Sequence, residues 1–392
     1  MAEDAVLAGL AIHATLTEAF STVFDQYPGL IPTVGIDFGD CLVANIGVRG
    51  DRELISIGNP ANNAAKIMRG GDHAITIGSD LYDNLDDEHQ RWFFRCGSNY
   101  RLKCSDVEDV EALVNDAGFS WSIASSANRF QRAKEALPLA DIVIEDAREQ
   151  IDLDRLSPTR AKRVPAASLF VDIDGYTKLV SDLDGDTDEL AKAVQVLHLF
   201  RYELRHVTEN DLGGIALQHQ GDRLQAILHD PRQDDEDIME RAVDLCIAYN
   251  SSVEEVININ HDILGKLHVA VGCAFGKALV GKLGIRGDRD PVCIGEATIE
   301  AEQLQLSMPG NHIAITGEVH DAITDEDIAD QFTHNTDEGY YEASDLTEIS
   351  IEEAADAKAY ASAKTASYTK AGTISIGSVS ATPLKVTRPY AG

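Results

Sequence analysis

The sequence is poor in basic residues. Lysine and arginine together number 33, against 66 aspartates and glutamates, and the formal net charge is −33. A chain this acidic lacks the positive surface that binding of nucleic acid or of an anionic membrane requires. It can still bind a nucleoside triphosphate when metal ions bridge the negative charges. The composition therefore makes a divalent metal a condition of any nucleotide-binding interpretation.

Signals for export, membrane insertion and disulfide formation are also missing. The chain begins MAED, which is acidic and unlike the basic start of a signal peptide. It has no run of about 18 uninterrupted apolar residues, so we expect no membrane span. None of its six cysteines forms a CxxC pair. We therefore expect reduced, mostly buried thiols in a cytoplasmic protein.

The chain contains an internal repeat. Residues 31–58 match residues 268–295 without a gap, so that each pair of equivalent positions is separated by 237 residues. Glycines recur in this register, as in the pair Gly35 and Gly272. Turn glycines that match over such a length indicate a duplicated domain. With 392 residues the chain is long enough for two or three domains.

The repeat predicts four divisions of the chain. We expect a partial first copy at 1–85, an extension and linker at 86–164, a second copy at 165–320 and an acidic extension of unassigned role at 321–392. The counterpart of the second copy's first strand would precede Met1, so we expect the natural chain to start upstream. An incomplete copy exposes a sheet edge, which oligomerisation would cover. The basic and aromatic stretch 91–103 is expected to be a packed hairpin.

Chemistry concentrates in the stretch SLFVDIDGYTKLV, residues 168–180. Its apolar residues predict a buried strand that ends in the acids Asp172 and Asp174. Gly175 breaks the strand and Thr177 can open a helix. Carboxylates beside helix N–H groups suit a divalent metal and a polyphosphate. An acidic surface strand and turn is the alternative.

A helix and a hairpin follow this stretch. Apolar residues from Leu190 to Val207 recur at spacings of three and four, which predicts an amphipathic helix. The sequence GGIALQHQGDRLQAIL predicts a β-hairpin that turns at Gln220 and Gly221, with Asp222 on the turn. On its own, Asp222 is better explained as a plain turn acid.

Four separated motifs resemble class III nucleotidyl cyclases. They are FVDIDGYT, the hairpin with GD, VGIDFGDCLVANIG and IGNPANNAAKI, and the resemblance covers roughly residues 4–80 and 165–320. It implies an α/β (α+β) fold with two cyclase homology domains, each built on a ferredoxin-like βαββαβ core. It further implies that the two copies, the first N-terminally incomplete, pair head to tail as a pseudo-heterodimer with the active site between them.

The resemblance assigns roles to the second copy. It implies that Asp172, Asp222 and the Ile173 carbonyl hold two divalent ions, Mg²⁺ or Mn²⁺. One ion would lower the pKa of the ribose 3′-hydroxyl and the other would draw charge from the triphosphate. The amides from Ile173 through Gly175 and Tyr176 to Thr177 would cradle the phosphates.

In the first copy, the resemblance assigns the catalytic asparagine to Asn62 and the transition-state cation to Lys66, where the family has arginine. Lysine keeps the charge but loses the bidentate fork. A polar residue at a helix start is the alternative for Asn62. The second copy has Ile299 and Gln303 at these positions, which cannot do this chemistry. The losses are complementary, which predicts one working site and one inactive pseudo-site.

The base pocket departs from known patterns. The positions that read adenine in the family hold Gln218 and Ile55, and the glutamate and cysteine of the guanine pattern are absent as well. The segment PAASLFVDIDGYTKLV, residues 165–180, is similar to the Pycsar cyclases, which make cyclic pyrimidine nucleotides in antiphage defence. That similarity favours UTP over CTP as substrate, with cUMP read by a separate effector protein.

Two other functions stay open at this point. One is an adenylate cyclase with an unusual base pocket. The other is a catalytically silent nucleotide-binding regulatory module, which Lys66 and the incomplete first copy would favour. The sequence does not show the activating signal, the preferred metal or the oligomeric state.

Overall fold

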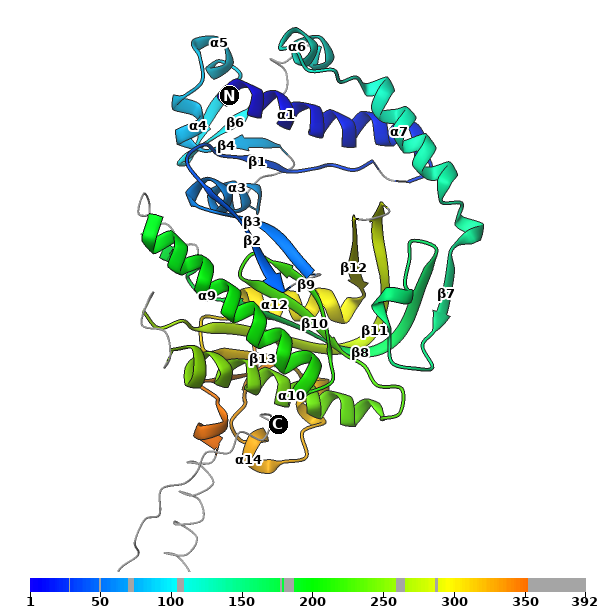
Figure 1. Cartoon of the computed structure of the whole chain (residues 1–392), viewed down its shortest axis with the longest axis vertical. Coiled ribbons are helices and arrows are strands. Elements are labelled where there is room, and N and C mark those ends of the chain that lie inside the picture. Colours follow the sequence, from blue (N-terminus) through cyan, green and yellow to red (C-terminus); the bar gives the residue numbers. More distant parts are fainter. Residues whose placement is uncertain are drawn as a thin grey trace, which may run out of the picture. The chain divides into compact units, whose positions relative to one another are not determined.

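The computed structural model places the chain in two compact units (Figure 1). One comprises Met1–Ile46, Arg52–Ile142 and Thr177–Ala191, and the other comprises Gly47–Asp51, Val143–Tyr176 and Lys192–Gly392. The structure describes residues 1–27, 29–48, 51–69, 74–103, 109–176, 178–179, 187–258, 265–285 and 288–351. The two units are taken in turn below.

The elements before residue 143 are, in chain order, α1 (Ala2–Ala14), η1 (Thr15–Ala19), α2 (Phe20–Val23), β1 (Val34–Ile36), β2 (Leu42–Val48), β3 (Asp51–Ile57), α3 (Asn59–Arg69), β4 (Ile75–Ile77), α4 (Ser79–Asp83), α5 (Asp87–Gln90), β5 (Phe93–Cys96), β6 (Asn99–Leu102), α6 (Val110–Asp116), α7 (Ile123–Ala136) and η2 (Leu139–Asp141). The hairpin predicted within 91–103 is confirmed, because β5 and β6 pair antiparallel.

The elements after residue 142 are β7 (Val143–Asp146), η3 (Leu153–Arg155), β8 (Arg160–Ile173), α9 (Thr187–His206), η4 (Val207–Asp211), β9 (Ile215–Gln220), β10 (Arg223–Leu228), α10 (Asp235–Ser251), η5 (Ser252–Ile257), β11 (Val269–Ile285), β12 (Asp288–Ile294), α12 (Glu296–Ser307), β13 (His312–Thr316), α13 (Gly317–Asp321), α14 (Glu326–Ala329), β14 (Thr333–Asn335) and β15 (Tyr340–Ser344). The predicted strand, amphipathic helix and hairpin of the second copy are confirmed in β8, α9 and β9–β10.

The core of the first unit lies between a sheet and helix α1. The sheet has the order β1-β4-β6-β5. Val6, Leu7 and Leu10 of α1 are buried in a cluster that includes Ile75 and Ile77 of β4. Of the described residues, one helical stretch, residues 2–23, is long and apolar enough to span a membrane by those criteria alone. Its buried apolar residues have the place expected of a core helix.

The second unit contains the predicted ferredoxin-like core. The elements β8, α9, β9, β10, α10 and β11 follow one another as βαββαβ, and their strands lie in the order β11-β8-β10-β9. β8 pairs antiparallel with both β11 and β10, at the centre of this sheet (Figure 1). The predicted α/β fold class is therefore confirmed, whereas the pairing of the two copies stays a prediction.

The repeat recurs in the contacts between helix and strand. A Cβ on Gly35 of β1 would lie 2.1 Å from the Ala64 carbonyl oxygen of α3. A Cβ on Gly272 of β11 would lie 2.2 Å from the Ala301 carbonyl oxygen of α12. In both copies a strand glycine therefore lets the helix backbone approach the sheet closely. Both glycines and both alanines are 237 positions apart, so the duplication extends to individual contacts.

The strand order repeats as well. In the first unit β1 pairs parallel with β4, which pairs with β6 and then β5. In the second unit β11 pairs parallel with β13, which pairs with β15 and then β14. Within the stretch predicted to be an acidic extension, 321–392, β14 and β15 add two strands to the sheet. The β5–β6 hairpin of the first copy could have indicated an equivalent β14–β15 hairpin in the second copy.

Residues 143–164, which we expected to belong to a linker, also take part in the second unit. β7 pairs parallel with the start of β8. Ile151 and Leu156 are buried in a cluster with Val164. Isolated apolar residues between charged ones had no periodicity that would indicate burial. The division of the chain into domains remains a prediction.

The cysteines present no disulfide among the described residues. Cys246, Cys273 and Cys293 are buried and free, whereas Cys41 and Cys96 are free and exposed. The expectation of reduced thiols agrees with these positions, and the buried ones lie in the second unit.

Candidate active site

Asp172 lies near the end of strand β8, where the chain leaves the sheet. It lies opposite Arg223 of β10 in the strand register. Ile173 is buried, at 2% exposure, so only its main-chain carbonyl is available to a ligand. The chain then turns at Gly175, whose φ of +69° is a conformation that favours glycine. Strand β8 thus places the Asp172 carboxylate close to a tight turn.

Asp174, the second acid of the motif, has a structural role. Its carboxylate accepts a hydrogen bond from the Gly310 amide at 3.1 Å. Its own amide donates to the His268 carbonyl at 2.8 Å. These bonds fasten the end of β8 to the neighbouring loop, so the structure assigns Asp174 no place beside Asp172.

Asp222 lies on the turn of the β9–β10 hairpin. Gly221 precedes it with a φ of +69°, again a conformation that favours glycine. The carbonyl of Gly221 accepts two hydrogen bonds from Arg201 of α9, at 3.0 Å from Nε and 2.6 Å from an Nη atom. Arg201 is buried, at 3% exposure. The buried guanidinium therefore fixes the turn that carries Asp222.

The two carboxylates interact. Burial, followed by the negative charge of Asp172, raises the pKa of Asp222 to about 8, while Arg201 and Arg223 act in the opposite direction. The charged form of Asp222 is thus held at an electrostatic disadvantage beside a second acid. A cation at this position would relieve it. Within the described ranges no cluster of three or more histidine, cysteine or acidic side chains gathers at a possible metal site. The candidate metal site therefore depends on this pair together with main-chain oxygen.

Tyr176 follows the turn and is buried. Its hydroxyl has no hydrogen-bond partner within the described structure. Burial, then the charge of Asp222, raises the pKa of Tyr176 well above its usual range. The hydroxyl therefore stays protonated and is available as a donor beside the carboxylates. Thr177, the next residue of the predicted phosphate cradle, lies outside the described residues.

Arg223 lies next to Asp172, on the neighbouring strand β10. Its guanidinium lies 4.3 Å from the centre of the Phe170 ring and pairs with Glu302 of α12 at 2.8 Å. Because Glu302 neutralises it, Arg223 leaves the carboxylate pair only partly compensated. Two exposed residues of the same helix, Ile299 and Gln303, occupy the positions of Asn62 and Lys66 in the repeat.

The two residues predicted to read the base lie on different units. Gln218 is half-buried on β9, where its side-chain oxygen accepts from Gln220 at 3.1 Å. Ile55 lies on β3 and is 7% exposed. Their roles in base recognition stay predictions.

Asn62 and Lys66 both lie on α3 of the first unit. Lys66 lines a hollow of about 350 Å³, together with Asn63, Asp37 and Asp80. Asn63, rather than Asn62, shares this hollow with Lys66, and its side chain hydrogen-bonds to Asp37. The carboxylate pair of Asp172 and Asp222 belongs to the second unit, so these acids and Lys66 lie in different units.

Arg201 is the functional residue that sequence reasoning missed. It lies four residues after Leu197 and three before Leu204, both of which are fully buried. A charged residue on the apolar stripe of a helix is buried with its charge, which requires a partner. The position of Arg201 on the apolar stripe of α9 could have indicated a buried charge, and its partner is the Gly221 carbonyl in the turn before Asp222.

Comparison with known proteins supports the cyclase interpretation. No family model matches the chain. The chain is 29% identical over 314 residues to a uridylate cyclase of Pseudomonas aeruginosa, a match that covers 76% of this chain and 58% of the relative. It is 26% identical over 298 residues to a uridylate cyclase of a Rhizobium species, with 72% and 56% covered. The chain thus spans a little over half the length of the curated relatives it matches.

A solved structure shows the same fold. A class III adenylyl cyclase-like ATP-binding protein from Pseudomonas aeruginosa matches with a TM-score of 0.72 and 26% identity, over 90% of this chain and 73% of that protein. The chain therefore has the fold of the class III nucleotidyl cyclases. The predicted resemblance to that family and to its pyrimidine branch is confirmed.

Proposed function

We propose that this chain is the cyclase part of a nucleotidyl cyclase that converts UTP to 3′,5′-cyclic UMP and pyrophosphate, with CTP as the less favoured substrate. In this reaction the ribose 3′-oxygen bonds to the α-phosphorus, the bond from that phosphorus to the β-phosphate oxygen breaks, and the hydroxyl proton passes to solvent. The carboxylate pair of Asp172 and Asp222 carries the proposal, because burial and then repulsion from Asp172 raise the Asp222 pKa. The uridylate cyclase relatives support the choice of base.

The donor set fits hard divalent cations. Two carboxylates and a main-chain carbonyl are oxygen ligands of the kind that Mg²⁺ and Mn²⁺ prefer. We propose that Asp172, Asp222 and the Ile173 carbonyl hold two such ions. When bound, these ions would acidify the 3′-hydroxyl and offset charge on the triphosphate.

The protein's own groups position the reactants. Arg201 holds the turn before Asp222 through the Gly221 carbonyl. The amides around Gly175, and the Tyr176 hydroxyl, face a phosphate as donors. Lys66 supplies positive charge to the α-phosphate as its charge grows in the transition state, and Asn62 orients the ribose. Gln218 has both a donor and an acceptor for a base edge, and Ile55 limits the space.

This proposal requires a first copy and a second copy to come together. The metal acids lie on the second copy, whereas Asn62 and Lys66 lie on the first. Intramolecular pairing of the repeats, or pairing between copies of the chain as a homo-oligomer, would complete the site. We further propose a cytoplasmic enzyme that acts on neither nucleic acid nor membrane, and whose product a separate effector protein senses in antiphage defence.

A second candidate function comes from the solved relative, which is called an adenylyl cyclase-like ATP-binding protein. That description favours either an adenylate cyclase or a silent nucleotide-binding module. The deciding experiment incubates the protein with ATP, GTP, CTP or UTP and Mn²⁺, and identifies products by mass spectrometry, beside an Asp222→Ala variant. Cyclic UMP that disappears in the variant would support the proposal. Cyclic AMP would replace the substrate, and binding of nucleotide without any product would indicate the silent module.

A further inference from the structure

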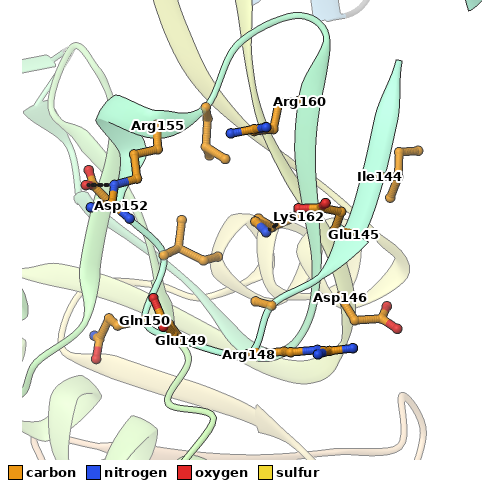
Figure 2. Close-up of a pocket in the computed structure, with 13 residues that line it drawn as sticks. Ile144, Glu145, Asp146, Arg148, Glu149, Gln150, Asp152, Arg155, Arg160 and Lys162 are labelled. Carbon is orange, nitrogen blue, oxygen red and sulfur yellow. Dashed lines mark hydrogen bonds and ion pairs between the residues drawn. The ribbon is translucent and has the colours of Figure 1, made fainter. Parts of the chain in front are cut away.

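The second unit contains a cavity of about 750 Å³ at the start of strand β8 (Figure 2). Residues 144–152, Arg155, Leu156, Arg160 and Lys162 line it. Its volume is typical of pockets that hold small organic ligands, about 300–1,000 Å³. Lys162 precedes Asp172 by ten positions on one strand, which is a separation of about 33 Å at ~3.3 Å per residue. The cavity is therefore distinct from the candidate active site.

Four cationic side chains border this cavity, beside the four acids Glu145, Asp146, Glu149 and Asp152; the cations are Arg148, Arg155, Arg160 and Lys162. Arg160 and Lys162 are two positions apart on β8, so both side chains project on the same side of the sheet. Figure 2 shows them together with Arg155 around the open space. Lys162 pairs with Glu145 at 2.7 Å, and Arg155 pairs with Asp152 at 3.2 Å. The guanidinium groups of Arg148 and Arg160 form neither a hydrogen bond nor an ion pair with another described residue, although, after Lys162, their charges help to lower the pKa of Glu145. Two of the four cations, Arg148 and Arg160, are thus available to a ligand, in a chain whose net charge is −33.

The paired cations also keep donors to spare. A lysine ammonium has three N–H donors and a guanidinium has five in a planar fork, and one carboxylate contact uses only part of them. The partners Glu145 and Asp152 hold Lys162 and Arg155 on the cavity wall. Fixed cations with a guanidinium between them match the tetrahedral oxygens of a phosphate group.

Part of the remaining wall is apolar. Ile151 and Leu156 are 8% and 5% exposed, and they belong to a buried cluster with Val164 and Ile227. These side chains are therefore part of the fold, and they border the cavity that the cations face. Such a wall suits the sugar and base of a nucleotide, or another organic body of similar size, rather than a bare inorganic ion.

We propose that this cavity is a second binding site, specific for a small organic phosphate of the size of a nucleoside monophosphate. Its phosphate contacts Arg160, with Arg155 and Lys162 beside it, and its organic body lies against Ile151 and Leu156. This site requires no metal and does not depend on the proposed cyclase function.

The test measures binding by isothermal titration calorimetry on the full chain in EDTA, where no metal supports the candidate active site. The probes are 5′-UMP, uridine and inorganic phosphate. The variants are Arg160→Ala and, as a matched control, Arg163→Ala, which removes an arginine of the same strand that does not line the cavity. Asp222→Asn reports on the candidate active site. Circular dichroism confirms that each variant is folded.

We expect saturable binding of 5′-UMP, with at least about a tenfold weaker affinity in Arg160→Ala and no change in Arg163→Ala or Asp222→Asn. Uridine should not bind, and inorganic phosphate should bind more weakly than 5′-UMP. The proposal is overturned by an absence of saturable 5′-UMP binding, by equal binding in Arg160→Ala, or by inorganic phosphate that binds as tightly as 5′-UMP. Binding lost only in Asp222→Asn would assign the nucleotide to the active site and equally overturn it.

Discussion

Two nitrogens of Arg201 donate to one oxygen, the main-chain carbonyl of Gly221. This contact joins helix α9 to the hairpin turn that presents Asp222. Because the arginine is buried, its loss leaves the Gly221 carbonyl without these donors and the turn without its support. A residue twenty positions away in the sequence thereby fixes the turn that carries the Asp222 carboxylate, the proposed metal ligand.

The first prediction concerns Arg201 itself. Arg201→Met should reduce cyclase activity by about tenfold to a hundredfold, because a displaced carboxylate weakens an electrostatic site. The concentration of Mn²⁺ needed for half-maximal activity should rise at the same time. Arg201→Lys should recover part of the activity. Arg205→Gln, on the next turn of the helix, is the matched control because Arg205 pairs with Glu209 at the helix surface. A fall in stability with unchanged Mn²⁺ dependence would show a purely structural role.

The second prediction concerns the repulsion between the metal acids. Asp222→Asn should abolish cyclase activity and yet raise the melting temperature of the metal-free protein, since asparagine brings no charge next to Asp172. Mn²⁺ should raise the melting temperature of the wild type and leave that of the variant unchanged. Differential scanning fluorimetry with and without EDTA measures both. Equal Mn²⁺ shifts in the two proteins would remove Asp222 from the metal site.

The third prediction uses the repeat as its own control. Lys66→Ala should lower kcat by about 10²–10³-fold, by analogy with the loss of one transition-state donor. Lys66→Arg should be active, because the charge is kept and a bidentate fork is added. Gln303→Ala, at the equivalent position of the second copy, should leave activity unchanged. Steady-state kinetics decide, and equal effects at positions 66 and 303 would contradict a division of labour between the copies.

The fourth prediction is a pH dependence at His219. Burial, then the charges of Arg201 and Arg205, lowers the pKa of His219 to about 3. An unfolded histidine titrates near pH ~6.5, so between about pH 6.5 and 3 the unfolded state binds more protons and the unfolding free energy falls as pH falls. Urea unfolding at pH 7 and pH 5 should show this loss in the wild type and a smaller loss in His219→Gln. His206→Gln, at an exposed histidine, should behave as the wild type does.

The fifth prediction tests the close packing of helix on strand. Gly272→Ala should destabilise the protein by about 1–3 kcal/mol, the usual cost of overpacking, because the new Cβ would lie 2.2 Å from the Ala301 carbonyl oxygen. Gly35→Ala should act similarly in the first copy. Gly281→Ala is the control on the same strand, since its Cβ would lie 3.5 Å from the nearest atom, an ordinary contact. Similar midpoints for Gly272→Ala and Gly281→Ala in urea unfolding would argue against the close contact.

The sequence predicted those parts of the fold that have a regular pattern. Apolar spacing located α9, turn residues located the β9–β10 hairpin, and the offset of 237 residues located the duplicated strand and helix. β7, β14 and β15 were missed because they are only four, three and five residues long, too short for a clear alternation of apolar and polar residues, and only their pairing within the sheet makes them strands. Tertiary context decided those segments, as it often does for exposed strands.

The candidate site was predicted in the same uneven way. Asp172, Gly175 and Asp222 were identifiable because a strand end and a tight turn have local signatures. Arg201 was not, since its role depends on a hydrogen bond across twenty residues of sequence. The cavity at Arg160 could not be predicted from the sequence either. That Arg160 and Lys162 share one side of the sheet follows only once strand β8 is known to begin at Arg160.

The helix contact at Gly35 and Gly272 has a consequence for how the copies diverged. Helix α12 is seated on the sheet by backbone against backbone, so its attachment does not depend on the residues of its outward side. Ile299 and Gln303 are exposed on that side. Substitutions there are therefore expected to carry little structural penalty, so a copy could exchange these two residues and keep its scaffold. Inactivation of one site in such a tandem pair needs no loss of architecture.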